Sequence, residues 1–181
     1  LEQNAAAPLT ETAQAYVDAE KGVADAKEAI DGAKDIIAEQ ISDEADYRIY
    51  IRNLTFEEGK IVSTAKDEKE QSVYENYYAY EEPIKKVVGH RILALNRGEK
   101  EKMLIVKIEA PTDRILRYLE KQVITADNPV TTPVLTEVIA DAYTRLIAPA
   151  IEREIRNELT EKAEDGAITV FGKNLEQLLM Q

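Results

Sequence analysis

Cysteine and tryptophan are absent from this sequence, and histidine occurs once, as His90. Without cysteine the chain has no disulfide bond, no thiolate nucleophile and no thiolate zinc site. Because His90 is the only imidazole, a metal site would have to use carboxylates and would hold a hard cation. The absence of cysteine also fits a reducing compartment, and we expect a cytoplasmic location.

Long hydrophobic runs are absent too, because no segment approaches the roughly 18 apolar residues that cross a bilayer. The opening "LEQNAAAPLTETAQAY" lacks the basic-then-apolar layout of a signal peptide. We therefore expect no membrane association. The chain begins with Leu1 rather than methionine, which indicates a fragment of a longer protein.

Breakers of helices are scarce, with 7 glycines and 6 prolines among 181 residues, while 44% of the residues are hydrophobic and 32% are charged. This composition predicts an ordered and mainly α-helical chain. The net charge is −12 and the calculated pI is about 4.7. Such a chain repels nucleic acid on average, so any contact with a polyanion would have to be local.

Apolar residues that recur every three or four positions predict several amphipathic helices. In the first helix these positions are Val23, Ala26, Ile30, Ala33, Ile37 and Ile41. A second helix is expected over 43–54 with Ser42 as its N-cap, and another over 71–80, where "QSVYENYYAY" places Tyr74 and Tyr78 four residues apart. Two segments rich in β-branched residues, 60–66 and 103–108, are the best strand candidates.

The remaining helices are predicted from their ends. Gly98 is expected as a left-handed C′ residue that closes a short helix, and Thr112 begins the next helix after Pro111. Thr132 is expected as the N-cap of a long helix with Pro133 in its first position. Pro149 predicts a kink or a break in that helix, and a last helix carries Ile168, Phe171, Leu175, Leu178 and Leu179.

Together these segments predict a mainly α fold, an elongated multi-helix assembly with a long C-terminal helix and a small two-stranded β element. We expect a partly helical N-terminal flank over 1–17 and a central helical region with the β element over 18–128. The long helix, with its kink at Pro149, and the terminal helix fill 129–181.

No motif predicts catalysis. The letters of a helicase box appear at Asp43–Asp46, but no Gly-rich loop ends in Gly-Lys-Ser/Thr, so the acidic residues fit better in the first turn of a helix. No nucleophile elbow Gly-x-Ser-x-Gly is present. We expect His90 to be a packing residue. The sequence thus predicts no enzyme, no catalytic residue, no cofactor, no metal and no small-molecule substrate.

One segment, residues 84–107, reverses the charge of the chain. It holds seven basic and two acidic residues, for a local net charge of +5, whereas the first forty residues carry −6. The candidate nucleic-acid-binding residues are Lys85, Lys86, Arg91, Arg97, Lys100 and Lys102. They form either a phosphate-binding edge or a set in which the arginines pair with carboxylates and the lysines keep a turn soluble. We favour the second interpretation, because the field of the whole chain opposes a polyanion.

The same part of the chain resembles a known family. "YYAYEEPIKKVVGHRILALNRGEKEKMLIVKI" (Tyr77–Ile108) is similar to the middle region of the bacterial transcription accessory protein family Tex. The segments Asp18–Glu39 and Ala142–Met180 also resemble that family, in the same order. Two positions differ: Gly89 replaces a usual serine, and Gly166 lies in a normally Ala-rich helix.

This resemblance implies a central helical piece that precedes an RNase H-like domain in a larger protein, whose C-terminal OB-fold contacts RNA. It implies a structural role in positioning nucleic-acid-binding modules. Two alternatives remain open. The basic segment contacts RNA or DNA weakly, or the tyrosine-rich stretch 74–80 docks a transcription protein such as RNA polymerase. An exposed apolar patch there would favour docking, and buried tyrosines would exclude it.

Overall fold

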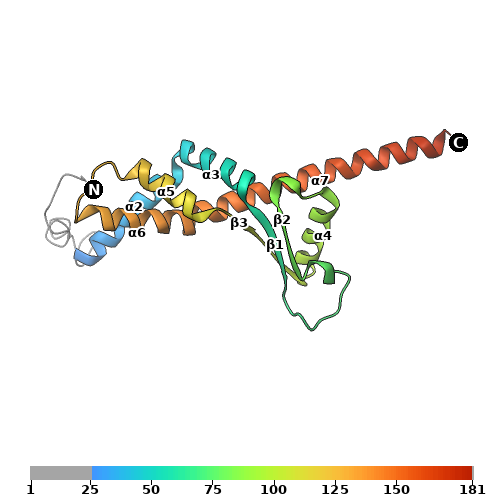
Figure 1. The fold of residues 1–181 in the computed structure, drawn as a ribbon, viewed down its shortest axis with the longest axis horizontal. Helices are drawn as coiled ribbons and strands as arrows, with labels where there is room; N and C mark the ends of the chain where they lie inside the picture. Colours follow the sequence, from blue (N-terminus) through green and yellow to red (C-terminus); the bar gives the residue numbers. More distant parts are fainter. Residues whose placement is uncertain (1–25, 181) are drawn as a thin grey trace, which may run out of the picture. The chain divides into compact units, whose positions relative to one another are not determined.

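The computed structural model describes residues 26–180 and is mainly α-helical (Figure 1). Its helices are α2 (Ala26–Asp43), α3 (Ala45–Glu58), α4 (Gly89–Lys100), α5 (Thr112–Val123), α6 (Thr131–Asp141) and α7 (Ala148–Leu179). Its strands are β1 (Lys60–Ala65), β2 (Ala79–Pro83) and β3 (Leu104–Glu109). The helical fold class, the long C-terminal helix and a small β element are thus confirmed. The N-terminal flank and the start of the first helix at Val23 lie outside the described residues.

The chain divides into two compact units. Unit 1 contains the chain up to Ile51 together with Thr112–Ala150, and unit 2 contains Arg52–Pro111 together with the chain from Ile151 onward. The helices α3 and α7 therefore each contribute residues to both units. Over residues 26–180, no helix has the length and hydropathy that a membrane span requires.

Unit 1 is a helical core built from α2, α5, α6 and the π-helical segment η4 (Ala142–Ile147). Its fully buried side chains include Ala38, Ile115, Leu119, Ile139 and Ile147. Ala38, Ile41 and Ser42 are buried in the middle and last turns of α2, while Ala33 is exposed. The amphipathic helix predicted from the sequence is therefore present, and of its predicted core positions Ala26 and Ile41 are buried, Ile30 and Ile37 are half-buried, and only Ala33 is exposed.

Unit 2 is organised around an antiparallel sheet in the order β2-β1-β3. The central strand places Ile61 between Glu82 and Ile108, and Ser63 between Tyr80 and Val106. Ile61 and Ser63 are fully buried, and the Ser63 hydroxyl donates to the Tyr77 carbonyl at 2.7 Å. The helix α4 packs on β3, so one face of the sheet is covered (Figure 1).

The sheet corrects the two-stranded prediction. The strands predicted at 60–66 and 103–108 exist and pair directly, but Ala79–Pro83 adds a third strand. The helix predicted over 71–80 is wrong, because this stretch forms a loop, the short 3-10 turn η2 (Glu75–Tyr77) and the beginning of β2. The pairing of β2 with β1 decides the conformation of these residues, so tertiary contacts override their local propensity.

Three predicted helix ends are also wrong. Ser42 is not an N-cap but a buried residue of the last turn of α2. Gly98 is not left-handed, because α4 continues to Lys100 and the residue with positive φ is Lys102, at 62°. Thr132 lies inside α6. The side chain of Asn128 accepts instead from the N–H of Val130, the residue before the helix, at 2.8 Å and from the N–H of Thr131, its first residue, at 3.2 Å.

Pro149 neither breaks nor ends the helix. It lies in the first turn of α7, directly after the π-helical segment η4. In η4 the carbonyl of Tyr143 accepts a hydrogen bond from the N–H of Ala148, five residues later, which is the pattern of a π bulge. Further along the chain, α7 continues without interruption through Gly166 to Leu179, so the predicted terminal helix is the end of the same helix.

Gly98 is explained by packing. A Cβ atom added there would lie 2.5 Å from Leu104 Cδ1 and 2.8 Å from Leu104 Cγ, and Leu104 is itself buried. The glycine therefore allows α4 to approach β3 closely.

We predict that Gly98→Ala lowers the free energy of unfolding by about 1 to 2 kcal/mol, because the overpacking outweighs the gain in helix propensity. Gly166→Ala is the matched control. A Cβ there meets no atom within 4 Å, so the same change should raise stability by up to about 1 kcal/mol. Urea denaturation followed by circular dichroism measures both. Equal effects of the two substitutions would contradict the packing explanation.

Candidate nucleic-acid interface

The six candidate basic residues lie on three successive pieces of unit 2. Lys85 and Lys86 belong to the 3-10 turn η3 (Ile84–Lys86), Arg91, Arg97 and Lys100 belong to α4, and Lys102 lies in the turn before β3. The helix α4 begins after Val88, which makes no side-chain capping bond. A Cβ on Gly89 would lie 3.1 Å from the Cα of Ala163, so the glycine permits close contact between α4 and α7.

Arg91 is part of a polar network inside unit 2. Its guanidinium donates to Glu82 Oε2 at 2.9 Å, and the Tyr80 hydroxyl donates to the same oxygen. The Tyr80 hydrogen bond, together with Arg91, lowers the pKa of Glu82. Burial, and then the Glu82 carboxylate, raises the pKa of Tyr80 to about 12. Arg91 therefore links α4 to strand β2. This agrees with the prediction that the arginines of the basic segment pair with carboxylates.

Lys85 is also paired, but on the surface. Its Nζ lies 3.0 Å from Glu57 Oε2 on α3, and both side chains are largely exposed. An exposed pair of this kind contributes between zero and about 1 kcal/mol. Lys85 thus remains accessible, but its charge is partly offset by a neighbouring carboxylate.

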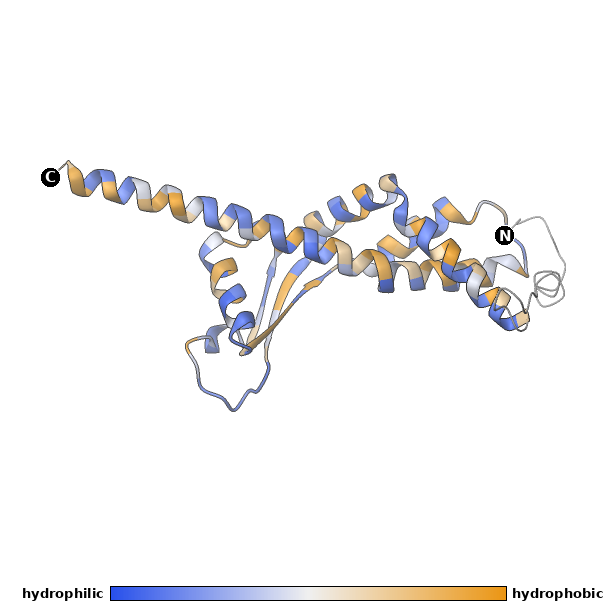
Figure 2. Cartoon of the chain, turned by 180° about the vertical axis from the view of Figure 1, so that it is seen from behind, coloured by the Kyte–Doolittle hydropathy of each residue, from blue (hydrophilic) through white to orange (hydrophobic). Residues whose placement is uncertain are grey.

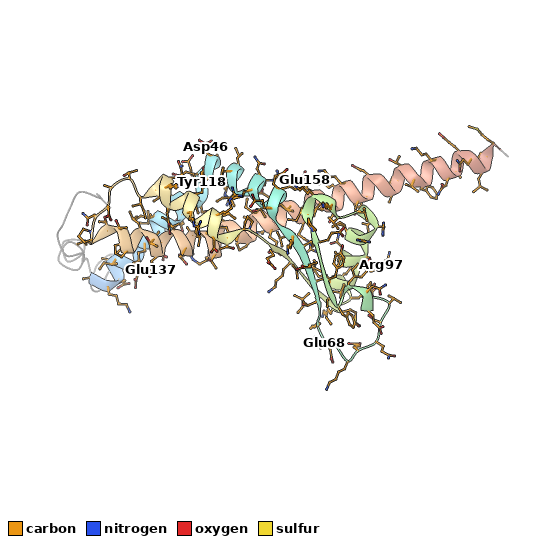
Figure 3. All side chains as sticks on the ribbon, in the orientation of Figure 1. Asp46, Glu68, Arg97, Tyr118, Glu137 and Glu158 are labelled. Carbon is orange, nitrogen blue, oxygen red and sulfur yellow. The ribbon has the colours of Figure 1, made fainter. Side chains whose placement is uncertain are left out.

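The other four candidates differ from these two. Lys86, Arg97, Lys100 and Lys102 are exposed, and within residues 26–180 none of them forms an ion pair. Figure 3 shows Arg97 on α4. The sequence interpretation predicted that both arginines of the segment pair with carboxylates. For Arg97 this prediction is wrong.

The two acidic residues of the basic segment have partners inside unit 2. Glu99 binds Arg156, with Oε1 2.8 Å from Nη2. Glu101 lies near the Tyr74 hydroxyl, and its carboxylate, after burial, raises the pKa of Tyr74, while the charge of Arg97 acts in the opposite direction. As a result, both carboxylates interact within the unit, while Lys100 and Lys102 lie in solvent.

Arg156 of α7 is the residue that sequence reasoning missed. Its guanidinium donates to Glu99 at 2.8 and 3.3 Å, to Asn96 Oδ1 at 3.0 Å and to the Val106 carbonyl at 3.3 Å. Only 17% of its side chain is exposed. It therefore joins α7 to both α4 and the outer edge of β3. No sequence motif connects Arg156 with residues about sixty positions earlier, so only the fold reveals this cluster.

The Arg156 cluster extends by two further bonds. Asn96 Nδ2 donates to Thr160 Oγ1 at 2.9 Å, and the Thr160 hydroxyl donates to the Arg156 carbonyl at 2.8 Å. Asn96 of α4 thus bonds to both Arg156 and Thr160 of α7.

His90 and the acidic side chains were considered as parts of a catalytic or metal site. His90 is exposed in the first turn of α4, so its predicted packing role is wrong. Within residues 26–180, no three acidic or histidine side chains are grouped as metal ligands.

The tyrosine-rich stretch does not form an exposed apolar patch. Tyr74 is buried, Tyr78 donates its hydroxyl to the Glu70 carbonyl at 2.5 Å, and Tyr80 binds Glu82. Val73, with 86% of its surface exposed, is the exposed apolar residue beside them. The docking surface predicted at 74–80 is therefore not supported.

Comparison with known proteins identifies the family to which this chain belongs. Residues 4–171 match the family described as Tex central region-like, and the chain belongs to that family. The resemblance found in the sequence is thereby confirmed.

Three relatives show how the chain relates to longer proteins. YdcI of Bacillus subtilis (strain 168) is 56% identical over 176 residues, which cover 96% of this chain and 24% of that protein. The transcriptional accessory protein Tex of Neisseria gonorrhoeae is 30% identical, covering 93% of this chain and 23% of its own length. The human S1 RNA-binding domain-containing protein 1 is 30% identical, and the match covers 88% of this chain and 18% of that protein. The chain thus spans a quarter or less of the length of these relatives.

The Arg156 cluster leads to a stability prediction. Arg156→Met removes charge-assisted bonds to α4 and β3, and we expect the free energy of unfolding to fall by about 2 kcal/mol. Arg156→Lys should recover less than half of this loss, because an ammonium cannot reproduce the planar fork. Arg153→Met, an exposed position on the same helix, should change stability by less than about 0.5 kcal/mol. Equal losses for Arg153→Met and Arg156→Met in urea denaturation would exclude the proposed link.

The Tyr80–Glu82–Arg91 network leads to a pH prediction. The pKa of Glu82 is lowered, so its contribution is present above about pH 4.5 and is lost as the pH falls through the lowered value. The pKa of Tyr80 is raised from 10.0 to about 12, so its contribution is present below pH 10 and is lost as the pH rises toward 12. We therefore expect Tyr80→Phe to lower stability by about 1 kcal/mol at pH 7, with a smaller loss at both extremes.

Tyr77→Phe is the control for this network, since Tyr77 packs edge-on against Tyr80 at 5.3 Å between ring centroids and does not bind Glu82. Urea denaturation at a series of pH values from 3 to 11 gives the difference between each variant and the parent chain. A difference for Tyr80→Phe that does not change with pH would rule out the network as its origin.

Proposed function

We propose that this chain is a non-catalytic structural part of a Tex-like transcription accessory protein, in which it positions the nucleic-acid-binding parts of the full-length protein. The proposal includes a cytoplasmic location and RNA or DNA as the ligand of the full-length protein. RNA polymerase or another transcription protein is the protein partner that such a role would require. Membership of the Tex central region-like family supports this assignment. So do the names of two relatives, a transcriptional accessory protein and an S1 RNA-binding domain-containing protein.

The Arg156 cluster carries the structural part of the proposal. A charged residue that is largely buried needs partners that offset the cost of removing its charge from water. Here the donors of Arg156 are directed to Glu99, Asn96 and the Val106 carbonyl, all within unit 2. Close contact at Gly89 and Ala163 supplies a second link between α4 and α7. These contacts fix the sheet and α4 on the long helix, which is what a positioning element needs.

The second candidate function is a weak direct contact with RNA or DNA. It is favoured by one observation, the four exposed cations Lys86, Arg97, Lys100 and Lys102 that form no ion pair within residues 26–180. The partners of Glu99 and Glu101 support it further, because carboxylates that interact within the protein repel phosphate less. The net charge of −12 opposes it.

Binding of the 181-residue chain to labelled single-stranded RNA and DNA distinguishes the two functions. The structural role predicts no salt-dependent binding in fluorescence anisotropy. Direct contact predicts that log K falls with log salt with a slope of about −2 to −3, as expected for three or four phosphates. That binding should disappear in the double variant Lys100→Glu, Lys102→Glu, and persist in the control Lys27→Glu, Lys121→Glu, which changes charge equally at exposed positions of unit 1.

A second experiment tests positioning directly. Arg156→Met in the full-length protein should weaken the binding of nucleic acid or of the protein partner about tenfold or more, although Arg156 contacts neither. Arg153→Met should leave binding unchanged. Full activity of the Arg156→Met protein, with the expected loss of stability in unit 2, would mean that the fixed geometry of this region does not matter for function.

A further inference from the structure

Within unit 2, the long helix α7 buries one apolar seam. We give this name to the four buried residues Ile151, Ile155, Leu159 and Ala163, which follow one another every four positions. Figure 2 shows hydrophobic and hydrophilic residues alternating along this helix. Apolar contacts are non-directional, and a stripe of this spacing offers similar side chains after a shift of one helical turn. The seam alone therefore fixes the rotation of α7 only weakly.

Polar contacts lie at the two borders of the seam. At one border Arg156 binds α4 and β3, as described above. At the other border Arg52 of α3 donates to Glu158 Oε2, and its Nε lies 3.7 Å from Glu154 Oε2. Arg156 and Glu158 are two positions apart, so at about 100° per residue they are separated by about 160° across the buried side of the helix. All four seam residues fall within this arc.

Lys162 extends the contact with α3 along α7 (Figure 3 labels Glu158 at this contact). Its Nζ lies 3.0 Å from Glu158 Oε1 and 5.4 Å from the centre of the Phe56 ring. A cation over an aromatic ring is attracted by the negative face of the ring. The hydrogen bond from Lys162 lowers the pKa of Glu158 most, and the charge of Arg52 acts in the same direction. Arg52 and Phe56, one helical turn apart, thus both bind α7.

The end of α3 passes directly into the central strand β1 at Gly59. The N–H of Gly59 donates to the Thr55 carbonyl at 2.8 Å, and its carbonyl accepts from the N–H of Ile84 at 3.1 Å. A Cβ at this position would lie 2.9 Å from Ile84 Cδ1 and 3.1 Å from the Glu109 carbonyl oxygen. The junction is closely packed, so a contact that fixes α3 also fixes the start of the sheet.

We propose that Arg52 is a second positioning residue, and that Arg52 and Arg156 together fix the rotation of α7 about its own axis within unit 2. This role of Arg52 rests on the positioning function proposed above, and it requires that both borders of the seam be held. The side chain of Arg52 is 36% exposed, and that of Arg156 is 17% exposed. Because salt screens an exposed pair more than a largely buried one, ionic strength weakens the contact with α3 first.

Urea denaturation of the 181-residue chain measures the two contacts separately. Arg52→Met should lower the urea midpoint by about 0.3 M at low salt, and this difference should fall to near zero in about 1 M NaCl, where the Debye length is about 3 Å. The shift caused by Arg156→Met should persist at both salt concentrations. Arg153→Met, an exposed change on the same helix, should leave the midpoint unchanged.

Spin labels measure the rotation directly, because the chain has no cysteine and labels can be placed at chosen sites. Asn76→Cys and Asn157→Cys put one label in the turn before β2 and one on the exposed side of α7. Double electron–electron resonance should give a narrow distance distribution in the parent chain at low salt. The distribution should broaden in Arg52→Met, and in the parent chain at about 1 M NaCl. An equally narrow distribution in Arg52→Met would overturn the proposal.

Binding of labelled single-stranded RNA to the full-length protein, at one fixed salt concentration, tests the functional part. Arg52→Met should weaken binding about fivefold, Arg52→Lys less, and Arg153→Met not at all. The combined variant Arg52→Met, Arg156→Met should bind about as weakly as Arg156→Met alone, because one lost border already frees the rotation. Its urea midpoint should instead fall by the sum of the two single shifts, because the two sites share no partner.

Three outcomes of the binding experiment would contradict the role of Arg52. Weaker binding in Arg156→Met but not in Arg52→Met would exclude it and leave the positioning function intact. Unchanged binding in both variants would overturn the positioning function, and the role of Arg52 with it. Binding losses that multiply in the combined variant would mean that the two residues act through stability alone.

Discussion

The contact of Arg156 with α4 and β3 is the interaction on which the architecture of unit 2 depends. A three-stranded sheet with one covering helix is a small layer, and a small unit buries a smaller share of its surface than a large one. Arg156 adds a third partner, since its guanidinium binds Glu99, Asn96 and the Val106 carbonyl at the edge of the sheet. The glycine at position 89 lets the backbones of α4 and α7 come close enough for these bonds. An exposed lysine could not replace this planar donor.

The parts of the fold that depend on local pattern could be predicted from the sequence. The β-branched segments at 60–66 and 103–108 became β1 and β3, and Pro111-Thr112 marked the start of α5. Strand β2 could not be predicted, because its half-buried face consists of Tyr80 and Glu82, which do not resemble an apolar alternation. Gly98 was misread for a related reason. Its small size serves a contact with Leu104, and a sequence shows the glycine but not the neighbour.

The candidate site was predicted only at the level of charge. The sequence identifies the basic residues of 84–107 but does not show which of them are neutralised, because that depends on partners such as Glu82 and Glu57, which come from other elements. The structure separates two paired residues, Arg91 and Lys85, from four that form no ion pair within residues 26–180, namely Lys86, Arg97, Lys100 and Lys102. The sequence alone also cannot reveal Arg156, whose partners are about sixty residues away.

The π-helical segment at Ala142–Ile147 changes the direction of the side chains that follow it in α7. A wider turn accommodates one residue more than an α-helical turn, so the side chains that follow are rotated back by about 100°. This rotation keeps Ala142, Tyr143 and Ile147 buried together, although a regular helix would turn Ile147 further from Ala142. The segment is therefore equivalent to a one-residue insertion absorbed without a loop. The helix thus holds one residue more at this place, while the phase of its buried face is preserved on both sides.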